Sequence, residues 1–382
     1  MPFAFIVLIV AALHYYIGAR IVPQLNGIGW QIGLAALLAT SAVVMPLGFM
    51  MRRAGSERLR NALSWAGMLA MGLFSSLFIF TALRDLMLLG AAIFLSATGS
   101  GLFSIDRLES FTAPMVPAIA IALTFFGFLN ARRTAGVVTV EIPVAGLPLA
   151  LQGFTIVQIS DVHVGPTIRA RYVERIVAAV NRLQPDLVAI TGDLVDGSVA
   201  QLKQQVAPLA RLASRNGSFF VTGNHEYYSG VVPWISELQR LGINVLHNEH
   251  VVIERGDAKL VLAGVTDFTG GHFDESHRSD PQASLARAPG DAAVKVLLAH
   301  QPRSAAAASR AGFDLQLSGH THGGQFWPWN HFVRLQQPFT AGLNRLDELL
   351  VYVSRGTGYW GPPKRLFAPS EITQVRLVAA SA

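Results

Sequence analysis

The stretch FTIVQISDVH, residues 154–163, contains the pattern that decides the fold of the larger part of this chain. Residues 154–160 form a short apolar run rich in β-branched side chains, which predicts a buried strand. Asp161 and His163 follow directly at its end. Because extended residues two positions apart point to the same side, both side chains are expected to face one ligand site.

Further predicted strands end in polar residues in the same way. These strands are residues 187–191, 219–222, 294–298 and 315–317, and the polar residues that follow them are Asp193, Asn224, His225, Glu226, His300, His320 and His322. Ligand sites in open α/β sheets lie outside the carboxyl ends of strands, so these side chains are expected to converge. Strands and helices alternate at first, and strands dominate later. This order predicts an α/β sandwich with mixed sheets.

At these residues the sequence resembles the calcineurin-like metallophosphoesterase family, and the resemblance covers most of residues 150–382. It is most similar to the membrane-associated branch, which includes YkuE-type bacterial proteins and transmembrane proteins with a metallophosphoesterase domain. The tail segments RGTG (355–358), GPP (361–363) and PSEI (369–372) support that subgroup. The resemblance implies an enzyme, a metal-dependent phosphoric ester hydrolase.

The resemblance also implies a centre with two divalent metal ions. The first ion would be held by Asp161, His163, Asp193 and His322. The second would be held by Asp193 as a bridge and by Asn224, His300 and His320. His225 would lie beside the scissile phosphate without binding metal.

The chemistry of the residues agrees with this implication. The donors are nitrogen and oxygen only, which suits Mn, Fe, Zn, Co or Ni. Paired divalent ions can activate water and stabilise charge on phosphorus. His225, as an imidazolium, could protonate the leaving group. Glu226 has two interpretations, a residue that orients the His225 loop or an ordinary surface acid.

The N-terminal third of the chain has a different composition. The whole chain is 51% hydrophobic and only 14% charged, and five apolar stretches of roughly membrane-spanning length precede the predicted strands. These stretches are residues 3–22, 30–51, 62–83, 86–103 and 111–130. We therefore expect a transmembrane domain of about five helices over residues 1–130 and a metallophosphoesterase domain over residues 131–382. Apart from Arg20 near the end of the first stretch, the stretches contain no Asp, Glu, Lys or Arg, which argues against a transporter.

Charge distribution predicts the membrane topology and excludes one class of partner. Arg52, Arg53, Arg58 and Arg60 form the strongest positive-inside signal, so their loop is expected to be cytoplasmic. Three further spans would then place the catalytic domain of this multi-pass protein outside the cytoplasm. The net charge of +6 is spread evenly along the chain and forms no basic stripe, so no nucleic acid partner is expected.

The sequence leads to one main functional hypothesis and two alternatives. The main hypothesis is a membrane-bound dinuclear phosphoesterase whose substrate is a lipid or a lipid-linked phosphate ester, because several spans are attached. One alternative is a pyrophosphatase of a nucleotide-linked lipid such as UDP-diacylglucosamine. The other is a non-catalytic membrane sensor that binds phospholigands. Residues 267–291 could form a substrate lid, and the aromatic residues 326–329 with Tyr359 and Trp360 could form an interfacial belt.

Overall fold

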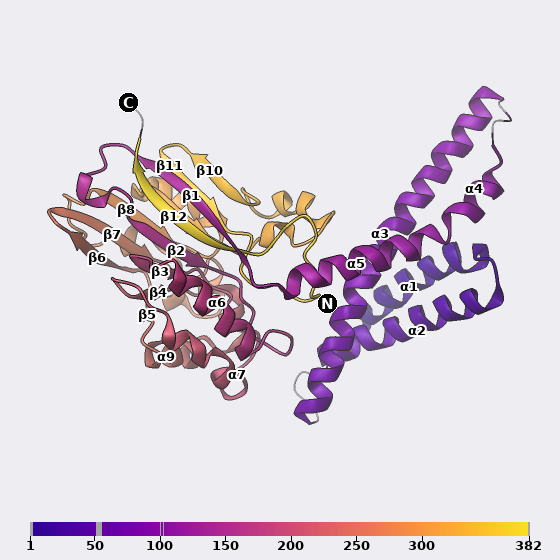
Figure 1. The fold of residues 1–382 in the computed structure, drawn as a ribbon, viewed down its shortest axis with the longest axis horizontal. Coiled ribbons are helices and arrows are strands. Elements are labelled where there is room, and N and C mark those ends of the chain that lie inside the picture. The colour runs from indigo at the N-terminus through magenta and orange to yellow at the C-terminus, as the bar shows by residue number, and fades with distance from the viewer. Residues whose placement is uncertain (1–2, 51–55, 100, 102, 381–382) are drawn as a thin grey trace. The chain divides into compact units, whose positions relative to one another are not determined.

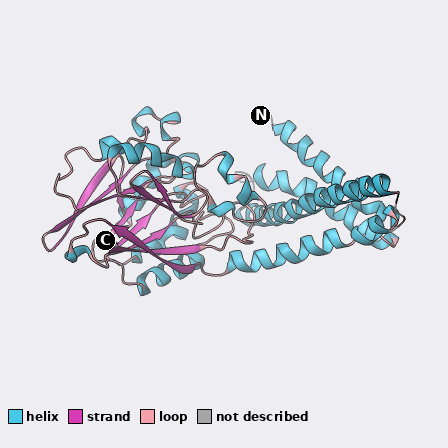
Figure 2. Ribbon diagram, turned by 90° about the horizontal axis from the view of Figure 1, so that it is seen from above, coloured by secondary structure: helices cyan, strands magenta, loops and turns pink. Residues whose placement is uncertain are grey.

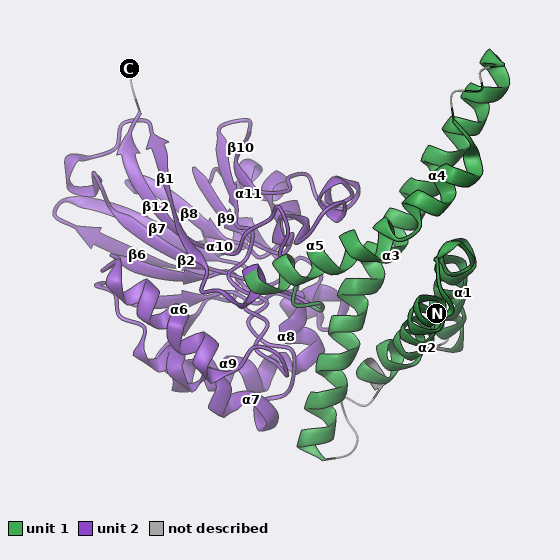
Figure 3. Ribbon diagram, turned by 45° about the vertical axis from the view of Figure 1, so that its right-hand side comes forward, with its two compact units in different colours: residues 1–129, 361–364 green, residues 130–360, 365–382 purple. Residues whose placement is uncertain are grey.

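The computed structural model describes residues 3–50, 56–99, 101 and 103–380. The chain divides into two compact units (Figure 3). The helical unit contains Met1–Leu129 together with Gly361–Lys364, and the sheet unit contains Asn130–Trp360 together with Arg365–Ala382. A short late segment of the chain therefore belongs to the N-terminal unit.

Long apolar helices and the short helix α4 build the helical unit (Figures 1 and 2). The helices are α1 (Phe3–Ile21), α2 (Ile28–Met50), α3 (Glu57–Thr98), α4 (Ile105–Thr112) and α5 (Met115–Arg132). Their shared core contains Ile17, Leu38, Leu77 and Val116. Four helical segments in the described chain are long and apolar enough to cross a membrane, residues 4–24, 28–48, 57–98 and 105–132.

The third and fourth predicted apolar stretches are not separate, because they belong mostly to one continuous helix. Helix α3 is 42 residues long and continues through Arg84 and Asp85. Neither residue breaks a helix as Gly or Pro would. At 1.5 Å per residue, α3 is about 63 Å long, roughly twice the hydrocarbon thickness of a bilayer. Only part of α3 can therefore lie within the hydrocarbon layer at a moderate tilt.

Polar partners from other helices surround the charged pair within α3. Arg84 is 4% exposed, and its Nε donates to Thr112 Oγ1 at 2.9 Å. Asp85 accepts hydrogen bonds from Tyr16 Oη at 2.8 Å and from Arg20 Nε at 2.9 Å. Residues near the ends of α1 and α4 thus compensate for charges that lie inside the apolar helix α3. The loop with Arg52 and Arg53 lies outside the described residues.

The sheet unit contains mixed sheets, as the sequence predicts, and there are two of them with six strands each. The first has the order β1 (Gly136–Val144), β12 (Glu371–Ala379), β2 (Thr155–Ile159), β3 (Leu187–Ile190), β4 (Ser218–Phe220) and β5 (Asn244–Val245). The second has the order β10 (Gly342–Leu346), β11 (Leu349–Val353), β9 (Leu315–Ser318), β8 (Val294–Leu298), β7 (Ala258–Gly264) and β6 (Glu249–Arg255). Strands β2 to β5 are mutually parallel, and so are β7, β8, β9 and β11.

Three apolar cores hold the layers of this unit together. Side chains from both sheets, such as Ile156 and Leu260, form the core between the sheets. A second core joins the first sheet to α6 (Ala170–Arg182), α7 (Val199–Val206) and α9 (Val231–Arg240). A third joins the second sheet to α11 (Ala305–Ala311). The remaining helices of the unit are α8 (Asn224–Ser229) and α10 (Pro281–Ser284).

Candidate metal centre

Every residue predicted for the site follows a parallel strand at its carboxyl end. Asp161 and His163 follow β2, Asp193 follows β3, and Asn224 and His225 follow β4 and begin α8. In the second sheet, His300 follows β8, and His320 and His322 follow β9. Both sheets therefore contribute side chains to the site.

These side chains form overlapping groups of donors. Three groups have ligand atoms within 4.8 Å of one another: Asp161 with His163 and His322, His163 with Asp193 and His225, and Asp193 with His300 and His320. The shortest separations between rings are 3.1 Å from His163 Nε2 to His322 Nε2 and 3.2 Å from His320 Nδ1 to His300 Nε2. The structure thus brings together seven of the eight predicted residues through their donor atoms.

Asp193 belongs to two of these groups. Its Oδ2 lies 3.2 Å from His300 Nε2 and 3.9 Å from His163 Nε2. The same oxygen lies 3.9 Å from His225 Nε2. A carboxylate between two sets of imidazoles is the arrangement that a residue shared by two cations requires.

The backbone of the site adopts a conformation that L-residues rarely take. Asp161, His163, Asp193, His320 and His322 all have φ between 50° and 70°. Such left-handed residues cost of the order of 1–3 kcal/mol each and persist where the surrounding structure requires them. Glycines allow the backbone to approach these side chains closely: a Cβ at Gly223 would collide with Asp193 Oδ1, and a Cβ at Gly319 with Asp161 Oδ2.

The eighth residue, Asn224, offers an oxygen that fits a cation. Asn224 is 9% exposed, and its buried Oδ1 has no hydrogen-bond partner in the described part of the chain. The N–H of the next residue, His225, donates to Asp193 Oδ1 at 2.8 Å, so Asn224 begins α8 beside the shared carboxylate. Buried polar atoms are nearly always satisfied. An unsatisfied amide oxygen on the residue that begins α8 at this site fits a divalent cation.

Histidines of the site differ in protonation state, because their pKa values are shifted in opposite directions. Burial, together with nearby positive charge, lowers the pKa of His320 to about 3 and holds that of His322 well below its usual range. Both rings are therefore neutral, which is the form that binds metal. Burial opposes charge on His300, but the Asp193 carboxylate raises its pKa well above the usual range. Metal binding at His300 therefore requires the loss of a proton.

Asp196 is a site residue that the sequence interpretation missed. Its Oδ1 accepts hydrogen bonds from Nδ1 of His225 at 2.6 Å and from Nδ1 of His163 at 3.0 Å. Burial opposes ionisation, but the two imidazoles hold the pKa of Asp196 well below its usual range. Its position three residues after Asp193, before Gly197, was the available signal. The carboxylate fixes both rings with Nε2 facing the site.

The hydrogen bond with Asp196 also raises the pKa of His225. Burial lowers the pKa of His225, but the hydrogen bond to Asp196 and the negative charges of Asp193 and Asp196 raise it to about 9. The ring is 16% exposed, so it reaches solvent at the surface of the site. An imidazolium at this position can donate a proton to an external group.

Glu226 orients the loop and is not a surface acid. It is fully buried, and its carboxylate accepts hydrogen bonds from the backbone N–H groups of Asp193, Leu194 and Gly223 at 2.7–3.0 Å. One side chain therefore holds the loop after β3 against the start of α8. This arrangement keeps Asp193 and His225 at a constant separation.

Exposed aromatic side chains surround His225. The ring of Trp360 lies 5.9 Å from that of His225, and the ring of Tyr228 lies 5.3 Å from it. Trp360 and Tyr228 are 51% and 61% exposed. Tyr359, which the sequence groups with Trp360, is 1% exposed and packs in the core instead. Large apolar surface is thus available next to the candidate proton donor.

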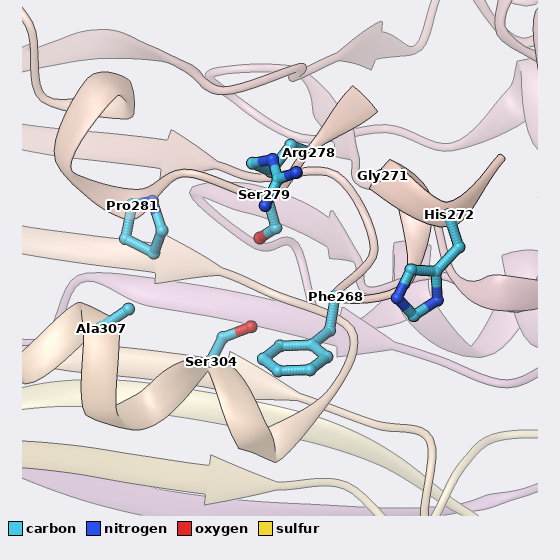
Figure 4. A pocket seen from close by; sticks show the side chains of 8 residues that line it. All are labelled: Phe268, Gly271, His272, Arg278, Ser279, Pro281, Ser304 and Ala307. Carbon is cyan, nitrogen blue, oxygen red and sulfur yellow. The ribbon is translucent and has the colours of Figure 1, made fainter. Parts of the chain in front are cut away.

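The stretch predicted as a lid forms a pocket wall. Residues 267–291 contain the short helices η5 (Gly270–His272), η6 (Glu275–His277) and α10. With Ser304 and Ala307 they enclose a pocket of about 380 Å³ (Figure 4). Phe268 and His272 are among its lining residues. None of the pocket's lining residues is among the predicted ligands.

Comparison with known proteins agrees with this geometry. A family model described as calcineurin-like phosphoesterase matches residues 154–324. The sequence is 41% identical over 270 residues to a transmembrane protein with metallophosphoesterase domain from Danio rerio, covering 69% of this chain and 62% of that protein. A metallophosphoesterase from Campylobacter jejuni is 34% identical over 261 residues, covering 68% of this chain and 67% of that protein.

The chain belongs to the calcineurin-like metallophosphoesterase family. Another metallophosphoesterase of the family, YkuE from Bacillus subtilis, is 31% identical over 235 residues, covering 59% of this chain and 80% of that protein. The chain of the present structure spans 62% of the length of the Danio rerio relative, a little under two thirds. The resemblance to the membrane-associated branch, inferred from the sequence, is confirmed.

Proposed function

We propose that this chain is a membrane-bound, dinuclear metal-dependent phosphoesterase that hydrolyses a phosphate ester. The observation that carries the proposal is the position of Asp193, whose carboxylate lies between the donors of His163 on one side and His300 on the other. Family membership supports the reaction class. The donor set fits Mn, Fe, Zn, Co or Ni.

We assign metal binding to one set of residues and proton transfer to His225. One ion would be held by Asp161, His163, Asp193 and His322, and the other by Asp193, Asn224, His300 and His320. When bound, divalent ions supply positive charge that attracts a phosphate ester and favours attack by water on phosphorus. His225, held as an imidazolium by Asp196, donates a proton to the oxygen of the leaving group.

We further propose a lipid or lipid-linked substrate. Four apolar helices suggest that the protein is embedded in a bilayer, although one helix would suffice as an anchor. The exposed rings of Trp360 and Tyr228 place apolar surface beside His225, where the leaving group would lie. Amphipathic aromatic side chains suit a ligand whose headgroup is polar and whose remainder is apolar.

The number of crossings determines the side of the membrane that we propose. With five spans, the arginine loop predicts a catalytic domain outside the cytoplasm. With four crossings, the arginine loop and residue 131 lie on the same side of the membrane. That side then has six arginines, and the other side has three. The six are Arg52, Arg53, Arg58, Arg60, Arg132 and Arg133, and the three are Arg20, Arg84 and Arg107. Because the positive-inside rule favours the side with more arginines, we propose that the sheet unit lies in the cytoplasm.

A chemical labelling experiment tests this topology. The chain contains no cysteine, so a single exposed Ala213→Cys variant is a unique label site. A membrane-impermeant maleimide should label it only after the cells are opened. Labelling in intact cells would place the sheet unit outside and contradict the proposed topology.

Two alternative functions differ in their support. A cytoplasmic sheet unit would give access to nucleotide-linked lipids, which favours a pyrophosphatase of a molecule such as UDP-diacylglucosamine. A non-catalytic sensor of phospholigands is less well supported, because the complete donor set and His225 are all present.

Hydrolysis assays on the full-length protein test the function. In detergent with added Mn²⁺, we expect turnover of p-nitrophenyl phosphate or its bis ester, and none with the Asp193→Asn variant. Incubation with lipid extracts, followed by mass spectrometry of the products, identifies the natural substrate and separates ester from pyrophosphate cleavage. Metal binding without any turnover would favour the sensor.

A further inference from the structure

The segment Gly361–Lys364, hereafter the strap, leaves the sheet unit for four residues. It belongs to the helical unit, whereas its neighbours Trp360 and Arg365 belong to the sheet unit. The chain therefore passes into the helical unit and returns within four residues. A segment of four residues spans at most about 14 Å. Its flanking residues therefore have little freedom when the strap itself is fixed.

A buried lysine fixes the strap within the helical unit. Lys364 is 1% exposed, and its ammonium donates to the carbonyl of Gly72 at 3.0 Å, to Ser76 Oγ, and to Thr124 Oγ1 at 3.3 Å. These acceptors come from α3 and α5. A buried ammonium costs several kcal/mol unless it is well hydrogen-bonded, so the position of Lys364 is specified by its acceptors.

Close packing adds to these hydrogen bonds. A Cβ built at Gly72 would lie 3.3 Å from Pro362 Cβ, which leaves little space for a larger residue. The glycine thus lets the strap approach the backbone of α3. Packing and polar contacts hold the same four residues in place.

The two neighbours of the strap both bind the loop that carries the candidate ligand His322. The N–H of Trp360 donates to Gln325 Oε1 at 2.8 Å, and its carbonyl accepts from Gln325 Nε2 at 2.9 Å. Arg365 is 1% exposed, and its Nη1 donates to the carbonyl of His322 at 2.9 Å. Residues 322–325 are thus bound from both ends of the strap.

Arg365 also ties this loop to other parts of the site. Its guanidinium donates to the carbonyls of Arg355 at 2.7 Å and Gly358 at 3.1 Å. Its Nη2 lies 3.1 Å from Nδ1 of His322. The side chain of Arg365 therefore sets both the backbone and the ring orientation of the candidate ligand.

We propose that Lys364 is a positioning residue for metal binding, which acts through Arg365 on His322. The fixed position of the strap then contributes to metal binding through its covalent neighbour Arg365. This inference rests on the proposed function, because it concerns the same centre. If Lys364 is released from its acceptors, the strap loses its fixed position, and Arg365 no longer holds the His322 loop in one geometry.

Metal titration of full-length variants in detergent tests the inference. Lys364→Met removes the ammonium but keeps a long side chain. Ser76→Ala removes one acceptor of the Lys364 ammonium and leaves the strap itself unchanged. Thr81→Val is the matched control, because Thr81 is also a buried hydroxyl of α3, but its hydrogen bond goes to Leu77 of the same helix. Equilibrium dialysis with Mn²⁺ and elemental analysis give the dissociation constants and the number of bound ions.

We expect Lys364→Met to weaken binding of one of the two ions about 10-fold or more, as supporting residues of metal ligands do. Ser76→Ala should weaken it less, and Thr81→Val should bind as the wild type does. Lys364→Arg, which keeps a cationic donor, should recover part of the affinity. Should Lys364→Met fail to fold, as judged by gel filtration, Ser76→Ala against Thr81→Val decides.

Unchanged Mn²⁺ affinity in both Lys364→Met and Ser76→Ala would overturn the positioning role. Failure of the proposed function has a different signature. A wild-type protein that binds two ions but hydrolyses no phosphate ester would refute the function, while the affinity differences among the variants would still test the strap.

Discussion

The carboxylate of Asp196 accepts a hydrogen bond of 2.6 Å from Nδ1 of His225, the candidate proton donor. This contact and the nearby negative charges raise the pKa of His225 to about 9 in spite of burial. A general acid must be protonated before it donates. The rate with a poor leaving group should therefore fall as pH rises through the pKa of His225.

Asp196→Asn should move this fall in rate to lower pH. The substitution removes the negative charge that stabilises the imidazolium, so the pKa of His225 decreases. The pH profile of kcat with an alkyl phosphate measures the change, and the profile with p-nitrophenyl phosphate is the control. An alkaline limb at the same pH in both proteins would contradict the role of Asp196.

His225→Ala should keep both metal ions and lose on the order of 10²-fold or more in rate. The loss should be smaller for p-nitrophenyl phosphate, whose leaving group needs no proton, than for an alkyl ester. Elemental analysis of the purified variant verifies the metal content. Missing metal would instead make His225 a ligand, which its place in one donor group allows.

Asp193→Asn should abolish hydrolysis and leave fewer than two ions per chain. The carboxylate lies between His163 and His300, so the loss of its charge weakens both sets of donors. Asp314→Asn is a suitable control, because that carboxylate accepts from the backbone N–H of Lys295 away from the site. Full metal content with retained activity would refute the bridging assignment.

Metal affinity should rise with pH. The pKa of His300 is raised well above its usual range by Asp193, so the metal-free ring is protonated at neutral pH. The ring must lose this proton to bind a cation, so binding releases protons and weakens as pH falls. Calorimetry of Mn²⁺ binding in buffers with different ionisation enthalpies counts the released protons. Binding heats that do not depend on the buffer would contradict this prediction.

Trp360→Ala should reduce turnover of a lipid phosphate in bilayers more than turnover of p-nitrophenyl phosphate. The Trp360 ring is exposed and lies against His225, where an apolar leaving group would make contact. Equal losses on both substrates would remove the support that Trp360 gives to a lipid substrate.

The sequence alone was sufficient for the fold class and for most of the residues that converge at the site. Apolar β-branched runs identify strands locally, and polar residues at their ends, such as Asp161 and His320, are recognisable without knowledge of distant contacts. Parallel strands present their carboxyl ends at one edge, so the convergence of these residues follows from their order along the chain. Their roles as ligands remain predictions.

The tertiary structure decided features that depend on partners far along the chain. Arg84 and Asp85 look like a break between helices, but polar groups from α1 and α4 allow α3 to continue through them. Asp196 differs from an ordinary loop acid only because two imidazoles reach it. Lys364 likewise acquires its place from acceptors nearly 300 residues earlier, at Gly72 and Ser76. Local periodicity reports which side of an element is apolar, but it contains no information about which distant groups fold against that element.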